Sequence, residues 1–267
     1  MMMHLPQSNL LPRDFVPNKA LGQNFLTDET VIGAILDAAD IRGKTVLEIG
    51  PGTGSLTEGL LDRAFRVAAV EKDGRLCEVL RERFGEKLTL VHADFLDADV
   101  ASLMQGQSWH ALGNLPYYAT TPIVLKLLTL LPESMTLMVQ KEAAERFFAS
   151  CKDRVYGPLS VMTRCFYHAS TALDVPRSCF SPAPEVDSAV VRLERNDTTV
   201  QNPAAFLAFL KQAFSMRRKT LNNSLMRDIR VPDALQACGV SQDARAEALN
   251  PETLLRIYCI LTPQEER

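Results

Sequence analysis

Apolar and polar positions along the chain form alternating blocks that predict buried strands separated by helices. Val46, Leu47 and Ile49 form a short apolar run with β-branched members, which is typical of a strand buried on both faces of a parallel sheet. From Lys44 to about Glu194, this alternation predicts an α/β domain with a doubly wound, mostly parallel sheet. The helices expected between its strands cover residues 56–64, 74–84, 122–131 and 141–152, and residues 136–141 look like a fifth strand.

The pattern changes near Asn196, where the polar stretch NDTTVQN indicates a linker. Asn202 and Pro203 are residue types that begin helices, and apolar residues recur at helical spacing after them. A second helix start is expected at Asn250, with the helix running to Leu261. We therefore expect three parts: an extended lead-in over residues 1–18, a main domain over residues 19–198 and a small all-helical domain over residues 199–267.

The stretch VLEIGPGTGSLT, residues 46–57, predicts a strand, a glycine turn and a helix start. Gly50, Gly52 and Gly54 let the backbone turn tightly and approach a ligand, which the amides of the new helix would face. The dinucleotide fingerprint G-x-G-x-x-G requires its third glycine at Ser55, so it does not fit. With Glu48 included, the string E-x-G-x-G-x-G resembles motif I of S-adenosylmethionine-dependent methyltransferases, although a plain tight turn is the alternative for glycines alone.

Polar residues recur downstream at intervals of about one βα unit. Glu71 ends an apolar run 23 positions beyond Glu48, Asp94 follows 23 positions later, and Asn114 comes 20 positions after that. Carboxyl ends of parallel strands line one crevice, so these four side chains should converge there. A carboxylate about 20 residues beyond a glycine turn is placed to accept hydrogen bonds from ribose hydroxyls. The alternative is that each is only a helix cap or turn residue.

The segment Asn114-Leu115-Pro116-Tyr117 suits methyl transfer to a nucleobase amine, whose lone pair is delocalised into the ring. The Asn114 carbonyl oxygen and a backbone carbonyl at Leu115 or Pro116 could accept its two hydrogens and localise that lone pair. Tyr117 can stack on the base, a contact worth about 1–3 kcal/mol, and Pro116 stiffens the turn. A loop with a core tyrosine is the simpler alternative.

These strings together resemble the ribosomal RNA adenine dimethyltransferase family, and most closely its small-subunit branch. The matching strings occur in order over more than three quarters of the chain: KALGQNFL (residues 19–26), EIGPGTGSLT, VEKD, HADFL, NLPYY, FSPAPEVDSAV (residues 180–190) and RRKTLNNSL (residues 217–225). The resemblance implies a Rossmann-like class I methyltransferase sheet and a methyl group transferred from S-adenosylmethionine without a metal. Transfer would be an in-line displacement at the methyl carbon, with proximity and alignment of the reactants supplying most of the rate enhancement.

The resemblance also implies roles for individual residues. Residues 19–26 would cap the cofactor pocket and lead into a helix that begins after Thr27. The residues expected to bind the cofactor are Gln23, Asn24, Leu26, Gly50, Gly52, Gly54, Glu71, Asp94 and Asn114, with Glu71 on the ribose and Asp94 on the adenine amine. The residues expected at the reacting base are Asn114, Leu115, Pro116, Tyr117 and Phe180, with Phe180 opposite Tyr117. Without the resemblance, Phe180 would be interpreted as a core aromatic residue.

The implied partner is 16S rRNA in the small ribosomal subunit or its precursor. Two adjacent adenosines would be dimethylated in a loop near the 3′ end of this RNA, where bases can leave the stack at modest energetic cost. The net charge of −3 requires local basic patches for RNA binding. The residues expected to meet phosphates are Lys141, Arg146, Arg217, Arg218 and Lys219. For Lys141 and Arg146, a solvated helix face is an equal alternative.

Composition and the apolar segments bear on where the protein is located. Hydrophobic content of 46% with 23% charged residues is ordinary for a soluble globular protein. The six cysteines show no C-x-x-C pair, which favours reduced thiols of a cytoplasmic protein. The longest apolar segment, residues 122–139, is broken by Lys126, Pro132 and Glu133, so no membrane span is expected. The N-terminus lacks the apolar core of a signal peptide, and a monomer is expected.

Three other functions remain open at this point. A large-subunit rRNA adenine methyltransferase of the macrolide-resistance kind shares the catalytic strings, although KALGQNFL and RRKTLNNSL favour the small-subunit branch. DNA adenine methyltransferases usually carry two prolines after the Asp or Asn, whereas Leu115 stands there in this chain. A ribosome-assembly factor acting mainly by binding is the third. Tyr118, Ala119 and Thr120 replace the Asn, Ile and Ser that the family often carries, and we expect this to be tolerated.

Overall fold

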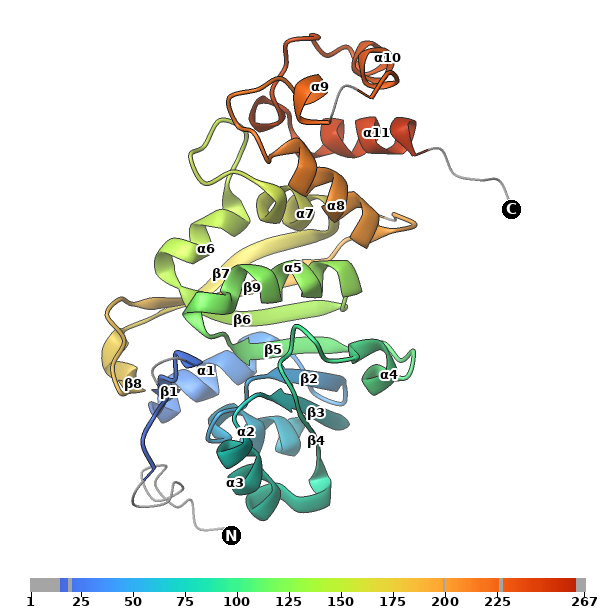
Figure 1. The fold of residues 1–267 in the computed structure, drawn as a ribbon. Helices are drawn as coiled ribbons and strands as arrows, with labels where there is room; N and C mark the ends of the chain where they lie inside the picture. Colours follow the sequence, from blue (N-terminus) through green and yellow to red (C-terminus); the bar gives the residue numbers. More distant parts are fainter. Residues whose placement is uncertain (1–14, 19–20, 199, 226–227, 263–267) are drawn as a thin grey trace. The chain divides into compact units, whose positions relative to one another are not determined.

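The computed structural model describes residues 15–18, 21–198, 200–225 and 228–262 (Figure 1). Its contacts divide the chain into two compact units, which are described separately here. The first unit draws on residues 1–127, 132–144 and 170–194, and the second on residues 128–131, 145–169 and 195–267. The second unit thus includes chain from before the expected boundary at 198/199. The limits 1–18, 19–198 and 199–267 for functional domains stay a prediction.

A seven-stranded sheet in the order β4-β3-β2-β5-β6-β9-β7 forms the centre of the fold (Figure 1). The pairs from β4 to β6 are all parallel, and β9 runs antiparallel to β6. This confirms the predicted mostly parallel α/β sheet. The strands are β2 (Thr45–Ile49), β3 (Arg66–Glu71), β4 (Leu88–His92), β5 (His110–Asn114), β6 (Ser134–Gln140), β7 (Tyr167–Val175) and β9 (Ser188–Arg195).

Helices connect these strands, and a small two-stranded sheet pairs β1 (Phe25–Leu26) with β8 (Phe180–Ser181). The helix expected after Thr27 begins at Glu29, because Asp28 is its N-cap and accepts a hydrogen bond from the Val31 amide. The helix expected over residues 141–152 ends at Phe148. The helices are α1 (Glu29–Ala39), α2 (Ser55–Arg63), α3 (Gly74–Phe84), α4 (Val100–Met104), α5 (Thr120–Leu130) and α6 (Lys141–Phe148), with 3-10 turns at Gly85–Lys87, Tyr117–Ala119 and Arg177–Cys179.

The core of the first unit joins helices α1 and α2 to the strands. Ile32 and Leu36 of α1 and Leu60 of α2 belong to one buried apolar cluster with Val46 of β2. Phe180, from the short strand β8, is part of the same cluster. This packing holds α1, α2 and the short strand β8 against the sheet.

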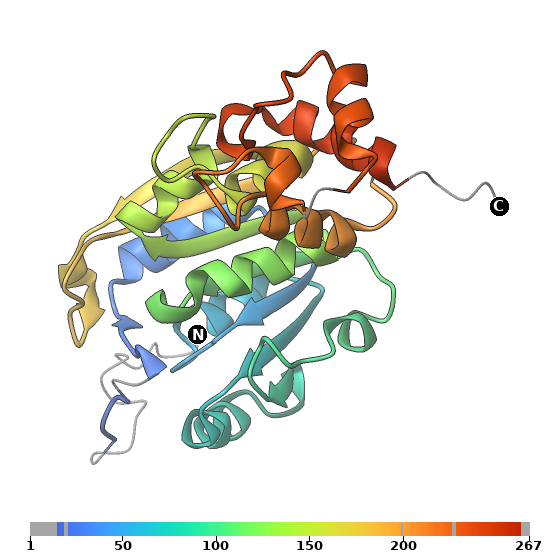
Figure 2. The same cartoon turned by 45° about the horizontal axis from the view of Figure 1, so that its top comes forward.

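The second unit is helical and is drawn mainly in orange and red in Figures 1 and 2. The Asn202 and Asn250 side chains cap their helices by accepting from Ala205 and Thr253 amides at 2.9 and 2.8 Å, as their positions predict. The rings of Phe206 and Tyr258 lie 5.0 Å apart in its core. Its helices are α7 (Pro158–Phe166), α8 (Pro203–Ala213), α9 (Leu221–Ser224), α10 (Val231–Ala237) and α11 (Pro251–Leu261), with a 3-10 turn at Ala246–Ala248.

Two general features follow from the described residues. All six cysteines are free thiols, and Cys77, Cys165 and Cys179 are buried. In the part of the chain that the structure describes, no helix is long and apolar enough to cross a membrane.

Candidate active site

A cavity of about 1000 Å³, open solvent at its mouth included, lies at the carboxyl ends of the parallel strands in the first unit. Open α/β sheets bind ligands at this edge. The structure brings Glu48, Glu71, Asp94 and Asn114 together on its walls, as their spacing predicts. The other expected residues on these walls are Gln23, Asn24, Leu26, Gly50, Gly52, Leu115, Pro116 and Tyr117.

The glycine turn between β2 and α2 forms the floor of this cavity. Gly50, Gly52 and Gly54 have φ values of 65°, 59° and 85°, in the left-handed region that side chains rarely adopt. A Cβ at Gly54 would lie 2.7 Å from the Phe84 ring. The packing of Phe84 against the turn therefore also favours a residue without a side chain at this position. The backbone conformation expected from the glycine spacing is therefore confirmed. Gly54 is the N-cap of α2 and is not among the cavity residues.

Two carboxyl groups lie beside the turn in different environments. Glu48 is 1% exposed and accepts a hydrogen bond from the Thr57 hydroxyl at 2.7 Å. Burial raises the pKa of Glu48 to about 8. Glu71 accepts the Gly52 amide at Oε2 (3.1 Å) and the Asp73 amide at Oε1 (2.8 Å), and burial raises its pKa as well. The Lys72 amide is a third backbone donor to this carboxyl group, and the remaining acceptor capacity of Glu71 faces the cavity, where it can accept a hydroxyl hydrogen.

Asp94 provides a third acceptor on the wall, just beyond β4. Its Oδ1 accepts the Leu96 amide at 2.9 Å, and its Oδ2 pairs with the Lys72 ammonium at 2.7 Å. The hydrogen bond from Lys72 is the main cause that lowers the pKa of Asp94. Asp94 therefore stays ionised near neutral pH and is suited to accept a hydrogen from an amine.

Asn114 ends β5 and faces the cavity in a defined orientation. Its Nδ2 donates to the Asn24 carbonyl at 3.1 Å, which leaves Oδ1 as an acceptor. The Pro116 carbonyl already accepts the Ala119 amide (3.0 Å) and the Thr120 hydroxyl (3.2 Å). Of the two backbone carbonyls that the sequence left open, the one at Leu115 is therefore the better placed second acceptor.

The two aromatic residues expected at the reacting base lie in different environments. Tyr117 lines the cavity, half-buried, and its hydroxyl is 2.8 Å from the Ser188 hydroxyl. Burial raises the pKa of Tyr117. Phe180 is 5% exposed and packs in the apolar core next to Leu26, its cross-strand partner. Phe180 is not among the residues that line the cavity, and its expected position opposite Tyr117 stays a prediction.

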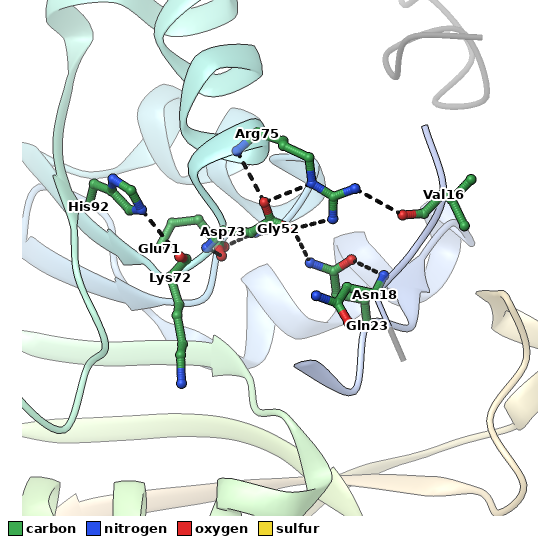
Figure 3. Close-up of polar contacts among 9 residues, drawn as sticks. All are labelled: Val16, Asn18, Gln23, Gly52, Glu71, Lys72, Asp73, Arg75 and His92. Atoms are coloured by element: carbon green, nitrogen blue, oxygen red, sulfur yellow. Dashed lines mark hydrogen bonds and ion pairs between the residues drawn. The ribbon is translucent and has the colours of Figure 1, made fainter. Parts of the chain in front are cut away.

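The segment before β1 is tied to the cavity wall by a polar network that sequence patterns did not reveal (Figure 3). The Gln23 amide uses both ends: Nε2 donates to Asp73 Oδ2 at 2.8 Å, and Oε1 accepts the Asn18 amide at 2.7 Å. Arg75 pairs with Asp73 at 2.6 Å and also donates to the Val16 carbonyl at 3.2 Å. The hydrogen bond from Arg75 is the main cause that lowers the pKa of Asp73 to about 2.

This network changes the interpretation of Gln23. Its side chain is used within the protein, so Gln23 holds the segment in place over the wall. The sequence analysis did not assign a role to Asp73, although Asp73 is the last residue of the VEKD string that contains Glu71. Lys19 and Ala20, the first residues of KALGQNFL, lie outside the described residues.

The basic residues expected to meet RNA are exposed in both units. In the first unit, Lys141 pairs with Asp174 at 3.0 Å. In the second unit, Arg217 pairs with Glu247 at 2.9 Å and donates to the Arg154 carbonyl at 2.7 Å. Exposed pairs of this kind contribute little to stability and exchange readily with other anions. Arg146, Arg218 and Lys219 are also exposed.

Comparison with known proteins identifies the family. The model of the family described as "Ribosomal RNA adenine dimethylase" matches residues 15–262 of this chain. The ribosomal RNA small subunit methyltransferase A of Bacillus pumilus is 37% identical over 264 residues, covering 91% of this chain and 90% of that protein. The protein of the same name from Clostridium perfringens (strain SM101) is 41% identical over 249 residues, covering 87% and 86%.

Two solved structures resemble the whole fold. A dimethyladenosine transferase from Plasmodium falciparum has a TM-score of 0.73 at 26% identity, with 87% of this chain and 95% of that chain covered. The 23S rRNA methyltransferase ErmE has a TM-score of 0.63 at 32% identity, with 90% and 100% covered.

The parallel sheet and the cavity at its carboxyl edge define a class I methyltransferase. Because the family match spans nearly the whole described chain, the chain belongs to the ribosomal RNA adenine dimethylase family. The sequence prediction of an rRNA adenine dimethyltransferase is thereby confirmed.

Proposed function

We propose that the chain uses S-adenosylmethionine to dimethylate N6 of two adjacent adenosines in a loop near the 3′ end of 16S rRNA, during small-subunit biogenesis in the cytoplasm. Support for the small subunit comes from relatives named for it, at 37% and 41% identity over most of their length. The observation that carries the chemistry is Asn114, held by the Asn24 carbonyl on the wall of the cavity that Glu71 and Asp94 also line.

The cavity suits the proposed cofactor. We assign the ribose hydroxyls to Glu71, which has two oriented oxygens, and the adenine amine to the ionised Asp94. Asn24, Leu26, Gly50 and Gly52 would contact the amino-acid end, with Gly54 shaping the turn. When bound, S-adenosylmethionine supplies a methyl group on a positively charged sulfur. We assign no metal to the reaction, because orientation of a neutral amine requires only acceptor oxygens.

The Asn114 segment would prepare the target amine. Asn114 Oδ1 and the Leu115 carbonyl accept one amine hydrogen each, which draws the hydrogens out of the ring plane and localises the lone pair on nitrogen. Tyr117 stacks on the adenine, while its bond to Ser188 fixes the direction of the ring. We assign the stacking contact to Tyr117 and not to Phe180, because Phe180 lies in the core.

RNA phosphates would bind the basic residues Lys141, Arg146, Arg217, Arg218 and Lys219. Each phosphate contact releases condensed counterions, so affinity for the subunit should fall steeply with salt. Extrusion of the target from a loop costs little, since loop bases are already unstacked in part.

The decisive experiment measures methyl transfer from labelled S-adenosylmethionine to unmethylated small subunits, large subunits and DNA. We expect dimethyladenosine in small-subunit rRNA only. Asn114→Ala should lower kcat by about 100- to 1000-fold, the usual effect of removing one oriented polar group at a reacting centre. Gln236→Ala, which removes an exposed amide in α10, is the matched control and should retain full activity.

Other outcomes would redirect the proposal. Label in large-subunit rRNA would favour the activity named for ErmE, which is 32% identical to this chain. Binding of precursor subunits without any methyl transfer would favour an assembly factor. Full activity of Asn114→Ala would show that the amine is oriented by another group.

A further inference from the structure

The segment that follows β4 is held by a lysine from a distant helix. The Lys126 ammonium donates to the Phe95, Leu96 and Ala98 carbonyls at 2.7, 2.9 and 2.8 Å. An ammonium carries three hydrogens, and here three carbonyls converge on it. The Phe95 ring lies 5.1 Å from the same nitrogen, a cation–π contact. One side chain thus ties together the backbone of residues 95–98.

This segment sets the position of Asp94. The Asp94 backbone carbonyl accepts the Asp97 and Ala98 amides, both at 3.0 Å, and its Oδ1 accepts the Leu96 amide. Asp94 and Phe95 both line the cavity, and Phe95 is 4% exposed. Any movement of the Leu96 or Ala98 backbone would therefore move the carboxylate that faces the cavity.

Lys126 reaches this segment from the helix that follows the catalytic turn. Helix α5 begins at Thr120, whose hydroxyl bonds the Pro116 carbonyl. Ile123, one turn before Lys126, lines the cavity. Burial lowers the pKa of Lys126, while Asp97, Asp94 and Asp99 act in the opposite direction and favour the charged form. The same helix therefore contacts the target side of the cavity at its start and the Asp94 side one to two turns later.

We propose that Lys126 is a positioning residue that sets the selectivity of the cavity for adenine in the cofactor. This inference rests on the proposed function, in which Asp94 accepts from the adenine amine. Hypoxanthine carries an oxo group in place of that amine and would present an acceptor to an ionised carboxylate. Discrimination between the two bases needs Asp94 at a fixed position, and the three carbonyl bonds of Lys126 supply it.

The geometry requires lysine at this position. The hydrogens of an ammonium point toward three separate directions, whereas the donors of arginine lie in one plane. Lys126→Arg keeps the charge but cannot reproduce three converging bonds. Lys126→Met keeps most of the apolar stem and removes all three donors. Lys87→Met, at an exposed position in a surface turn, provides a matched control.

The test compares binding of S-adenosylhomocysteine and S-inosylhomocysteine by isothermal titration calorimetry, with thermal unfolding of each variant. Wild type should prefer the adenosyl ligand by about 100-fold, since one hydrogen bond to a charged acceptor is lost. Lys126→Met should bind the adenosyl ligand about tenfold more weakly and the inosyl ligand unchanged, with Lys126→Arg intermediate. Lys87→Met should match wild type.

A merely structural role would give a different pattern. Equal weakening of both ligands in Lys126→Met, or no change in either, would overturn the inference while leaving the proposed function intact. If Lys126→Met does not fold, the selectivity ratio of Lys126→Arg decides: an unchanged ratio overturns the inference, and a reduced ratio supports it. Failure of wild type to bind S-adenosylhomocysteine would instead overturn the proposed function, and the inference with it.

Discussion

The two sides of the cavity are built in different ways. On the cofactor side, Glu71 and Asp94 each accept an amide two residues further along the chain, at Asp73 and Leu96, in addition to longer-range bonds from the Gly52 amide and the Lys72 ammonium. On the target side, Asn114 is oriented by a carbonyl 90 positions away, and Tyr117 by a hydroxyl 71 positions away. Local hydrogen bonds form wherever the strand ends form, whereas the distant ones need the completed fold. Substitutions on the two sides should therefore affect different measured quantities.

The largest effect on cofactor binding should come from Glu71. Glu71→Ala should weaken binding of S-adenosylhomocysteine by about 100-fold, because the ribose loses charge-assisted hydrogen bonds. At saturating cofactor, kcat should stay within a few-fold of wild type. Calorimetry and steady-state kinetics measure the two quantities, and Glu78→Ala, at an exposed position in α3, is the control. A large loss of kcat with unchanged affinity would contradict the division between the two sides.

Glu48 should affect stability with a characteristic pH dependence. Burial raises the pKa of Glu48 to about 8, against 4.5 for the ordinary group. Between these values the native state holds a proton that the unfolded chain has released, so wild type loses stability as pH rises. From pH 6 to pH 8, the free energy of unfolding of Glu48→Gln should rise by about 2 kcal/mol relative to wild type.

Urea unfolding at pH 6 and pH 8 measures the difference directly. Glu58→Gln is the control, because it makes the same substitution at a carboxyl group that is partly exposed on α2. Parallel pH profiles for Glu48→Gln and wild type would mean that Glu48 does not titrate between pH 6 and 8. Glu48 would then be ionised in the native state and would add a negative charge next to Glu71.

The aromatic residues test the target side. Tyr117→Leu should raise KM for the small subunit by about tenfold, within the range of a lost stacking contact. Phe180→Leu should lower the free energy of unfolding by about 1 kcal/mol, the usual cost of a core substitution of similar size, and leave KM near wild type. The converse result, a raised KM in Phe180→Leu without loss of stability, would restore Phe180 to the position opposite Tyr117 that its sequence motif suggests.

The smallest effect should come from the network around Gln23. Gln23→Glu places a carboxylate beside Asp73 and should speed cofactor dissociation about fivefold through like-charge repulsion, with little change in kcat. The double variant Gln23→Glu, Asp73→Asn restores a hydrogen-bonded pair and should recover part of the loss. Stopped-flow fluorescence would follow release, with Gln107→Glu at an exposed position as the control. Additive effects of the two substitutions would rule out coupling between Gln23 and Asp73.

Much of the fold and of the cofactor side could be predicted from sequence because both depend on local patterns. The glycine turn needs positive φ at Gly50, Gly52 and Gly54, which few other residues adopt. The spacing of Glu71, Asp94 and Asn114 follows the length of a βα unit, and parallel strands bring their carboxyl ends to one edge. Helix starts at Asn202 and Asn250 depend on a side chain and an amide three residues away.

The tertiary structure alone decided the contacts between distant segments. It placed Phe180 in the core, used Gln23 to bind Asp73, and aimed Lys126 at three carbonyls about 30 positions earlier in the chain. A motif states which residue types occur, but the direction of a side chain depends on what packs beside it. The sequence therefore determined the chemistry that this chain can offer, while the packing of distant segments decided which atoms are free to carry it out.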